Sequence, residues 1–200
     1  MGNITTLLFD LGGVIIELGS LEDMMSTSPL EEKEIWKGWI RSPSVQRFES
    51  GNCSAHEFAV SMIEEFSLAV TPDQFLETFN RWPRGPFKGA AQLLMGLSDD
   101  FRLACLSNSN ASHWANFLRH QPVLEHFEDQ FFSHEIGLLK PDSGAFDHAL
   151  VEMSVSPEEV VFFDDNLANV ESARSIGMQA HQVNSPDGVL HALYEQGLVG

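Results

Sequence analysis

Short apolar segments alternate with segments of helical periodicity along most of the chain. Apolar runs of strand length predict β-strands at residues 4–10, 101–107, 127–133, 159–164 and 178–183. Apolar residues at helical spacing predict helices at residues 88–98, 111–120, 142–153 and 167–176. Such alternation is typical of a parallel sheet with helices on both faces. The continuous apolar runs LLF and VVFF suit strands that are buried on both sides. The pattern therefore predicts an α/β fold with a three-layer core.

One long interval, residues 17–87, shows no convincing strand. It contains the helix-start patterns SPLE (28–31), SAHE (54–57) and TPDQ (71–74), and a fourth, SPEE, stands at 156–159. We therefore predict a small helical domain at 17–87, inserted into a core formed by 1–16 and 88–200. The sequence WPRGPF (82–87) predicts a hinge back to the core. Trp36 and Trp39, three residues apart on one helical face, are interpreted as packing residues.

The charge balance narrows the classes of partner. The 200 residues include 29 acidic and 11 basic side chains, for a net charge of −18. A protein that binds nucleic acid or an anionic membrane would need a basic surface, so neither partner is expected. No apolar run approaches a membrane span, and no basic segment typical of a signal peptide is seen. The start MGNITT fits a myristoylation pattern, but a strand from Ile4 would leave little free tail, so we expect no lipid. Two cysteines without a CxxC pattern predict reduced thiols, and we expect a cytoplasmic protein.

Polar side chains follow the predicted strands at the points where the strands end. Asp10 follows TTLLF, the pair Ser107 and Asn108 follows LACL, and the pair Asp164 and Asp165 follows VVFF. Lys140 lies in LLKPD, just before a predicted helix. Because the carboxyl ends of parallel strands lie along one edge of a sheet, we expect these side chains to converge on one crevice.

This set of groups predicts phosphoryl transfer. Three carboxylates in one cleft repel one another, and Mg²⁺, which prefers carboxylate and phosphate oxygens, would compensate their charge. The Ser107 hydroxyl, at an expected strand-to-helix turn, can hold a phosphate at a helix N-terminus. Lys140 can stabilise phosphate and nucleophile together. Asp10 can then attack phosphorus to form an aspartyl-phosphate that water hydrolyses, with Mg²⁺ as Lewis acid and template.

Four short motifs, FDLGGV, LSNSN, LKPD and FFDDN, occur in this order along the chain. In them the chain resembles the haloacid dehalogenase-like hydrolase superfamily, in the subgroup with a helical cap after the first motif. The resemblance implies a Rossmann-like core under a helical cap domain. It also implies Asp10 as nucleophile, Ser107 and the Asn108 amide as phosphate ligands, and Lys140 as the lysine that stabilises charge. Mg²⁺ would be held by Asp10, the backbone carbonyl of Gly12 and Asp165, with Asp164 close by and Asn169 supporting the acidic loop. The loop at 47–58 resembles the cap segment that reaches over the site, with Arg47, Glu49 and Asn52 as candidate contacts.

Gly12 departs from the pattern of most phosphatases of this superfamily, which carry an aspartate there as general acid and base. Such a group is worth about 10²–10⁴-fold in rate. The favoured interpretation is a phosphatase of a small phosphorylated metabolite whose leaving group needs little protonation. A sugar 1-phosphate qualifies, and the first motif resembles the D-L-G-[GN]-V motif of bacterial sugar 1-phosphate phosphatases. Glu17 or a cap glutamate could also replace the missing acid. The alternatives are a protein that binds without turnover and a 2-haloacid dehalogenase, although a dehalogenase has no use for the metal that Asp164 and Asp165 suggest.

Other chemistries lack their motifs in the chain. There is no G-x-G-x-x-G or Walker A sequence for a nucleotide, and no G-x-S-x-G elbow for a serine hydrolase. The 8 histidines show no H-x-x-x-H or HExxH spacing, so we expect no zinc site and interpret most of them as surface or hydrogen-bonded core residues. The sequence leaves the oligomeric state open, as monomer or dimer.

Overall fold

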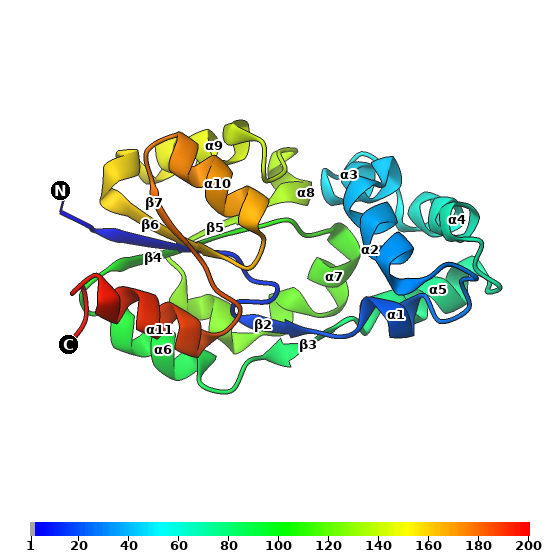
Figure 1. The fold of residues 1–200 in the computed structure, drawn as a ribbon, viewed down its shortest axis with the longest axis horizontal. Helices are drawn as coiled ribbons and strands as arrows, with labels where there is room; N and C mark the ends of the chain where they lie inside the picture. Colours follow the sequence, from blue (N-terminus) through cyan, green and yellow to red (C-terminus); the bar gives the residue numbers. More distant parts are fainter. Residues whose placement is uncertain (1–2) are drawn as a thin grey trace.

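The core of the protein is a parallel sheet of five strands in the order β5-β4-β1-β6-β7, in a computed structural model that describes residues 3–200 (Figure 1). The strands are β1 (Thr6–Phe9), β4 (Arg102–Ser107), β5 (Asp129–Phe132), β6 (Val160–Asp164) and β7 (Gln179–Gln182). Each of the five predicted strands is present, shorter by one to three residues, and all neighbouring pairs are parallel. The predicted α/β fold is therefore confirmed. The myristoylation pattern at Gly2 lies outside the described residues.

Helices cover both faces of the sheet (Figure 1). Because side chains alternate along a strand, Leu7 and Phe9 of β1 face one side and Leu8 faces the other. Helices α6 (Ala90–Leu97) and α11 (Pro186–Glu195) pack on the first face, and α9 (Ser143–Met153) and α10 (Leu167–Ser175) on the second. Three of these four helices were predicted, whereas α11 was missed. The result is the three-layer, Rossmann-like core.

Five further helices, which we call the cap helices, lie beyond one end of the sheet (Figure 1). They are α1 (Leu21–Met24), α2 (Glu32–Arg41), α3 (Pro43–Glu49), α4 (Ala55–Phe66) and α5 (Pro72–Asn80). A separate apolar cluster, which includes Phe48, Phe58 and Phe79, holds them together. The division into domains at 16/17 and 87/88 stays a prediction.

The helix-start patterns succeed in two of four cases. Ser54 with Glu57 and Thr71 with Gln74 form reciprocal capping boxes at the starts of α4 and α5. The start expected at 28–31 is wrong, because α2 begins at Glu32 and the Ser28 hydroxyl donates to the Phe66 carbonyl oxygen instead. The start at 156–159 gives only a 3₁₀ turn (Pro157–Glu159), because β6 begins at the next residue.

A two-stranded antiparallel ribbon joins the sheet to the cap helices. It pairs β2 (Ile16–Leu18) with β3 (Pro83–Pro86), so the expectation of no strand in 17–87 was wrong at both ends of that interval. The expected hinge at 82–87 is one strand of this ribbon. Trp82 extends the pairing, since its Nε1 donates to the Gly19 carbonyl oxygen at 2.7 Å and its own carbonyl oxygen accepts from the Gly19 amide at 2.7 Å. Both chain connections to the cap helices therefore run through one hydrogen-bonded element.

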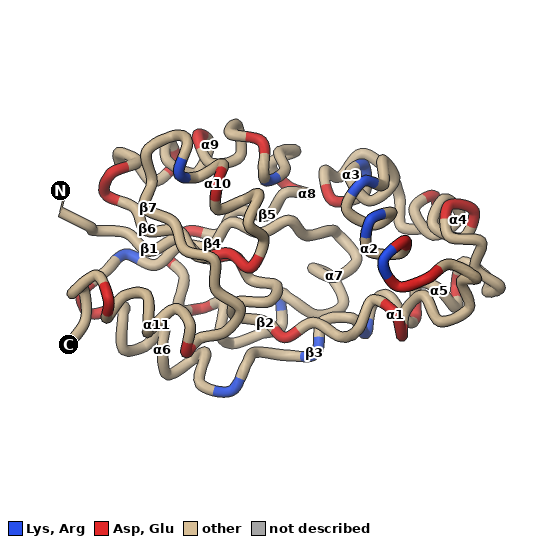
Figure 2. Tube along the Cα trace, in the orientation of Figure 1, with Lys and Arg blue, Asp and Glu red and all other residues tan. Residues whose placement is uncertain are grey.

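The remaining elements follow β4 and β5. They are α7 (Ala111–Asn116), 3₁₀ turns at Leu118–His120 and Pro122–His126, and α8 (Ser133–Ile136). Acidic residues occur along both the core and the cap helices, whereas basic residues are fewer (Figure 2). Within residues 3–200, no helix combines the length and the apolar character needed to cross a membrane. Cys53 and Cys105 are both free thiols.

Candidate active site

The predicted polar residues meet at the carboxyl edge of the sheet. Asp10 directly follows β1 and its amide donates to the Phe163 carbonyl oxygen at 2.8 Å, while Ser107 and Asp164 are the last residues of β4 and β6. A cavity of about 470 Å³ opens there, between the sheet and the cap helices. The predicted site residues that line it are Asp10, Gly12, Glu49, Ser107, Asn108, Lys140, Asp165 and Asn169. This is the edge at which open parallel sheets bind ligands.

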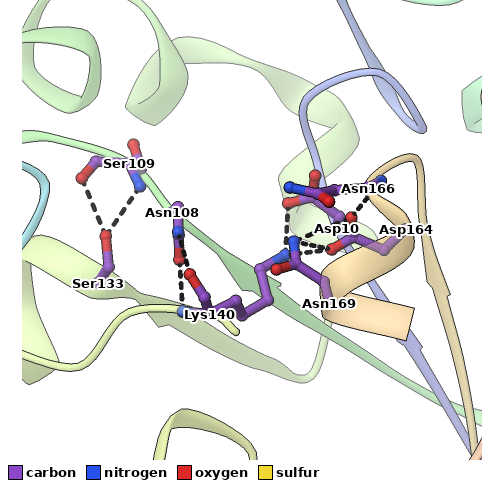
Figure 3. Close-up of polar contacts among 8 residues, drawn as sticks. All are labelled: Asp10, Asn108, Ser109, Ser133, Lys140, Asp164, Asn166 and Asn169. Carbon is purple, nitrogen blue, oxygen red and sulfur yellow. Dashed lines mark hydrogen bonds and ion pairs between the residues drawn. The ribbon is translucent and has the colours of Figure 1, made fainter. Parts of the chain in front are cut away.

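Lys140 is the positive centre of the site. Its Nζ lies 2.9 Å from Asp10 Oδ1 and 2.7 Å from Asp164 Oδ2, and its side chain is almost completely buried (Figure 3). Burial by itself would lower the pKa of Lys140, but the two carboxylates outweigh it and the pKa is raised. The ammonium group therefore stays charged between the two acids.

Asp164 is held by several donors at once. Besides the bond from Lys140, both carboxylate oxygens of Asp164 accept from Asn169 Nδ2 at 3.0 Å. Its Oδ1 also accepts from the Asn166 amide at 2.8 Å (Figure 3). Its side chain is fully buried. Asn169 lies where sequence reasoning placed it, while the contribution of the Asn166 backbone was missed. These contacts fix the acidic loop, and Asp164 in turn positions Lys140.

The site carries an excess of negative charge. Oxygens of Asp10, Asp164 and Asp165 lie within 4.8 Å of one another. Burial raises the pKa of Asp10 to about 7, because it outweighs the opposing attraction of Lys140, and repulsion by Asp164 and Asp165 adds smaller contributions. The pKa of Asp165 is also raised, by burial and then by Asp164. One ammonium does not balance three carboxylates, so this oxygen donor set suits a hard divalent cation such as Mg²⁺.

Asn108 positions Lys140 through its side chain. Its Nδ2 donates to the Lys140 carbonyl oxygen and its Oδ1 accepts from the Lys140 amide, both at 2.9 Å (Figure 3). Sequence reasoning assigned only the Asn108 backbone and missed this contact. The Ser107 hydroxyl lines the cavity without a hydrogen-bond partner in the part of the chain that the structure describes. Helix α7 starts at Ala111, where a helix was predicted to begin, with Asn110 as its cap, so loop amides lie between Ser107 and the helix N-terminus.

These motifs and this fold agree with a known family. The haloacid dehalogenase-like hydrolase model matches residues 4–177, which is most of the chain. The chain belongs to the haloacid dehalogenase-like hydrolase family.

Curated relatives of this hydrolase differ in length and activity. D-ribitol-5-phosphate phosphatase of Bacteroides thetaiotaomicron is 23% identical over 90% of this chain and 91% of its own, and phosphatase MT3486 of Mycobacterium tuberculosis is 26% identical over 98% and 97%. Drimenol cyclase DrtB of Aspergillus calidoustus is 27% identical over 95% of this chain, but the match spans only 36% of the cyclase.

Solved structures share the fold. A haloacid dehalogenase-family enzyme of Bacteroides thetaiotaomicron, in complex with magnesium and inorganic phosphate, superposes with a TM-score of 0.73 at 24% identity, over 90% of this chain and 93% of that one. A predicted hydrolase of the family from Porphyromonas gingivalis gives 0.80 at 22% identity over the whole of both chains.

Gly13 of this hydrolase permits the close approach of Asp165 to the first loop. Its φ is +75°, and an added Cβ would lie 2.3 Å from Asp165 Oδ2. Gly13→Ala should therefore lower the free energy of unfolding by about 1–2 kcal/mol from backbone strain alone, with a further loss from the displaced carboxylate. Urea unfolding measures this. Gly12→Ala is the matched control, because the new Cβ would meet only the flexible Leu18 side chain, at 3.1 Å. Equal losses in both variants would contradict the role given to Gly13.

The cap helices contribute Glu49 to the cavity but not the other two predicted residues. Arg47 and Asn52 are exposed and do not line it, and Asn52 Nδ2 donates to Ser50 Oγ instead. Glu17, a candidate acid, is likewise exposed on β2 and outside the lining. The interpretation of Trp36 as a packing residue was wrong, because it is 43% exposed and lines the cavity, whereas Trp39 is buried in the cluster of the cap helices.

His113 lines the cavity as a neutral side chain. Its Nε2 lies 2.8 Å from the Phe79 carbonyl oxygen and must therefore donate, so Nδ1 accepts from Asn110 Nδ2 at 3.1 Å. The imidazole also stacks on Phe79, with ring centroids 4.1 Å apart. Burial lowers the pKa of His113 from 6.5 to about 4, against a smaller opposing effect of the hydrogen bond to the Phe79 carbonyl oxygen.

Stability should fall in mild acid because of His113. The unfolded chain takes up the proton near pH 6.5 and the folded chain only near pH 4, so stability is retained above pH 6.5 and lost as the pH falls towards 4. The shift corresponds to about 3 kcal/mol. Urea unfolding of the protein and of His113→Phe between pH 7 and pH 4 should show a shallower decline for the variant. Parallel declines would exclude His113 as the cause, since the other histidines are common to both.

Proposed function

We propose that the protein is a Mg²⁺-dependent phosphatase that hydrolyses a small phosphorylated metabolite through an aspartyl-phosphate on Asp10. One observation carries the proposal. Asp10 is held by a buried lysine beside two further carboxylates, in a cavity where the Ser107 hydroxyl is free to bind phosphate. The relatives named as phosphatases, which match this chain over nearly its whole length, support the same reaction class.

Each residue has a role in the proposed reaction. An Asp10 oxygen forms a bond to phosphorus while the bond from phosphorus to the ester oxygen breaks. Ser107 and the Asn108 amide bind the phosphate oxygens, and Lys140 stabilises the negative charge on Asp10 and the phosphoryl group. Asn108 and Asp164 keep Lys140 in place through their contacts with its backbone and ammonium group. Water then hydrolyses the aspartyl-phosphate and releases inorganic phosphate.

The acidic cluster would hold the metal. Asp10, Asp165 and the Gly12 carbonyl oxygen are the proposed ligands of Mg²⁺, with the fully buried Asp164 alongside. When bound, the cation would offset the excess of carboxylates and polarise the phosphoryl group. The related enzyme solved with magnesium and inorganic phosphate supports this assignment.

A sugar 1-phosphate is the substrate we favour. The missing acid at position 12 suits a hemiacetal leaving group, which needs little protonation. Lys140 is the one Lys or Arg among the described lining residues, and it is already paired, so the cavity suits one phosphate on an uncharged group. Trp36, Trp39 and Trp82 also line the cavity, and the exposed ring of Trp36 can pack against the apolar face of a sugar ring.

Release of inorganic phosphate from sugar 1-phosphates, sugar 6-phosphates and an aryl phosphate tests the proposal. It is measured with Mg²⁺ and with chelator, beside Asp10→Asn as a control for contaminating phosphatases. Mg²⁺-dependent release that is lost in the variant is the expected result, and faster turnover of 1-phosphates would support the substrate. If no substrate of the panel releases phosphate, although the protein is folded and binds Mg²⁺, a binding protein without turnover would be favoured. Halide release from a 2-haloacid would instead indicate a dehalogenase.

A further inference from the structure

Glu49 lines the same cavity as Asp10 and Asp165. It is the last residue of α3 and its side chain is partly buried. Among the described residues that line the cavity, the carboxyl groups are those of Asp10, Asp165 and Glu49. Glu49 is thus the one lining carboxyl group that comes from the cap helices rather than from the edge of the sheet.

The backbone of Glu49 is fixed to the sheet domain. Its carbonyl oxygen accepts from Ser133 Oγ at 2.6 Å, and the same hydroxyl accepts from the Ser109 amide at 2.9 Å. Figure 3 shows Ser133 with Ser109, in the loop that follows β4. Two residues beyond Glu49, Gly51 has a φ of +73°, and an added Cβ would lie 2.6 Å from the His134 carbonyl oxygen. These contacts hold the end of α3 against α8, so the backbone that carries the Glu49 side chain is fixed at the wall of the cavity.

The surroundings of Glu49 favour its protonated form. Burial, and then the negative charge of Asp10, raise the pKa of Glu49 to about 8, against a smaller opposing effect of Lys140. A carboxyl group that still carries its proton near neutral pH can donate it to a leaving group. Glu17, the other acid considered for this role, is exposed on β2.

We infer that Glu49 is the catalytic acid and base of the proposed phosphatase, in place of the carboxyl group absent at Gly12. The inference rests on the proposed function. In the first step an Asp10 oxygen bonds to phosphorus, the ester bond breaks, and Glu49 gives its proton to the departing oxygen, which leaves as an alcohol. In the second step the Glu49 carboxylate takes a proton from water as the water oxygen bonds to phosphorus. The bond to Asp10 then breaks, so that Asp10 and Glu49 both return to their starting states.

Glu49→Gln should separate substrates by their leaving groups. For a sugar 6-phosphate, whose alkoxide must be protonated, kcat/KM should fall by about 10²–10⁴-fold. For an aryl phosphate, whose leaving group needs no proton, kcat/KM should change by less than about 10-fold, because it reports only the steps up to loss of the aryl group. Hydrolysis of the aspartyl-phosphate still lacks its base in the variant. The variant should therefore release about one equivalent of the phenol per active site in a burst, followed by slow turnover.

Two further variants complete the experiment. Glu64→Gln changes an exposed glutamate of α4, outside the cavity, and should leave both substrates unaffected. Gly12→Asp in the Glu49→Gln background should restore part of the activity on the sugar 6-phosphate, since the new side chain need displace only Leu18. Equal losses on both substrates without a burst would overturn the role of Glu49 and leave the phosphatase intact. Absence of Mg²⁺-dependent phosphate release in the unmodified protein would instead refute the proposed function itself.

Discussion

Asp10→Asn should abolish turnover without unfolding the protein. An amide cannot serve as the nucleophile, and loss of the nucleophile in an enzyme with a covalent intermediate typically costs on the order of 10⁴-fold or more in kcat. Asparagine has the shape of aspartate, so the packing after β1 should be preserved. The measurement is the rate of phosphate release at saturating substrate and Mg²⁺, with the Glu64→Gln variant prepared in parallel as a purification control. Residual activity above about 1% of the unmodified protein would require a different nucleophile.

The same variant should not destabilise the metal-free protein. Burial raises the pKa of Asp10 in spite of its pair with Lys140, so the ionised carboxylate is unfavourable in the folded protein, and the neutral amide removes that cost while Asp164 still pairs with Lys140. We expect a free energy of unfolding equal to or above that of the unmodified chain in chelator. Catalytic groups that repel one another are commonly held at such a cost in stability. A marked loss would mean that Asp10 has a structural role beyond its pair with Lys140.

An acid at Glu49 changes what Gly12 implies about the substrate. Without any acid, only esters with easily expelled groups are good substrates, which favours sugar 1-phosphates. With Glu49 in place, ordinary alkyl phosphates become accessible too, and the D-ribitol-5-phosphate phosphatase relative is named for such an ester. The two explanations are separable, because Glu49→Gln should widen the preference for a sugar 1-phosphate over a sugar 6-phosphate if Glu49 supplies the proton. An unchanged preference would favour an intrinsically easy leaving group.

The sheet and its catalytic edge were predictable because their signals are local. Runs such as LLF and VVFF mark buried strands, and the polar residues that follow them must lie at the carboxyl edge of a parallel sheet. The placement of Asp10, Ser107 and Asp164 follows from that rule alone.

The ribbon, the tryptophans of the cavity and the contacts of Glu49 depend on tertiary contacts that no short window of sequence shows. Strands β2 and β3 have three and four residues, β3 has prolines at both ends, and each forms only because the other returns beside it. Trp36 and Trp39 share one helical face and both line the cavity, yet only the packing of the cap helices decides that Trp39 is buried and Trp36 stays exposed. Ser133 joins Glu49 to Ser109 across 84 and 24 residues of sequence, and nothing around Ser133 signals this contact.

Lys140→Met should be the second variant with almost no turnover, and its effect on stability should be opposite to that of Asp10→Asn. Methionine fills a similar volume, but the charge that stabilises the nucleophile and the phosphoryl group is lost. Removing one such electrostatic group typically costs about 10²–10³-fold in kcat. Phosphate release on the best substrate of the panel measures this, and near-normal rates would refute the role of Lys140.

Metal-free Lys140→Met leaves Asp10 and Asp164 buried without their cation. Breaking a buried pair from one side costs about 3–5 kcal/mol, so urea unfolding in chelator should show a loss of that order. Added Mg²⁺ should recover part of the loss, because a cation bound only by the folded state stabilises it by mass action. The two variants together then test the charge balance of the site: removing a carboxylate should spare metal-free stability, and removing the ammonium should reduce it. Losses of the same sign and size would mean that packing, and not charge, determines the stability of this edge of the sheet.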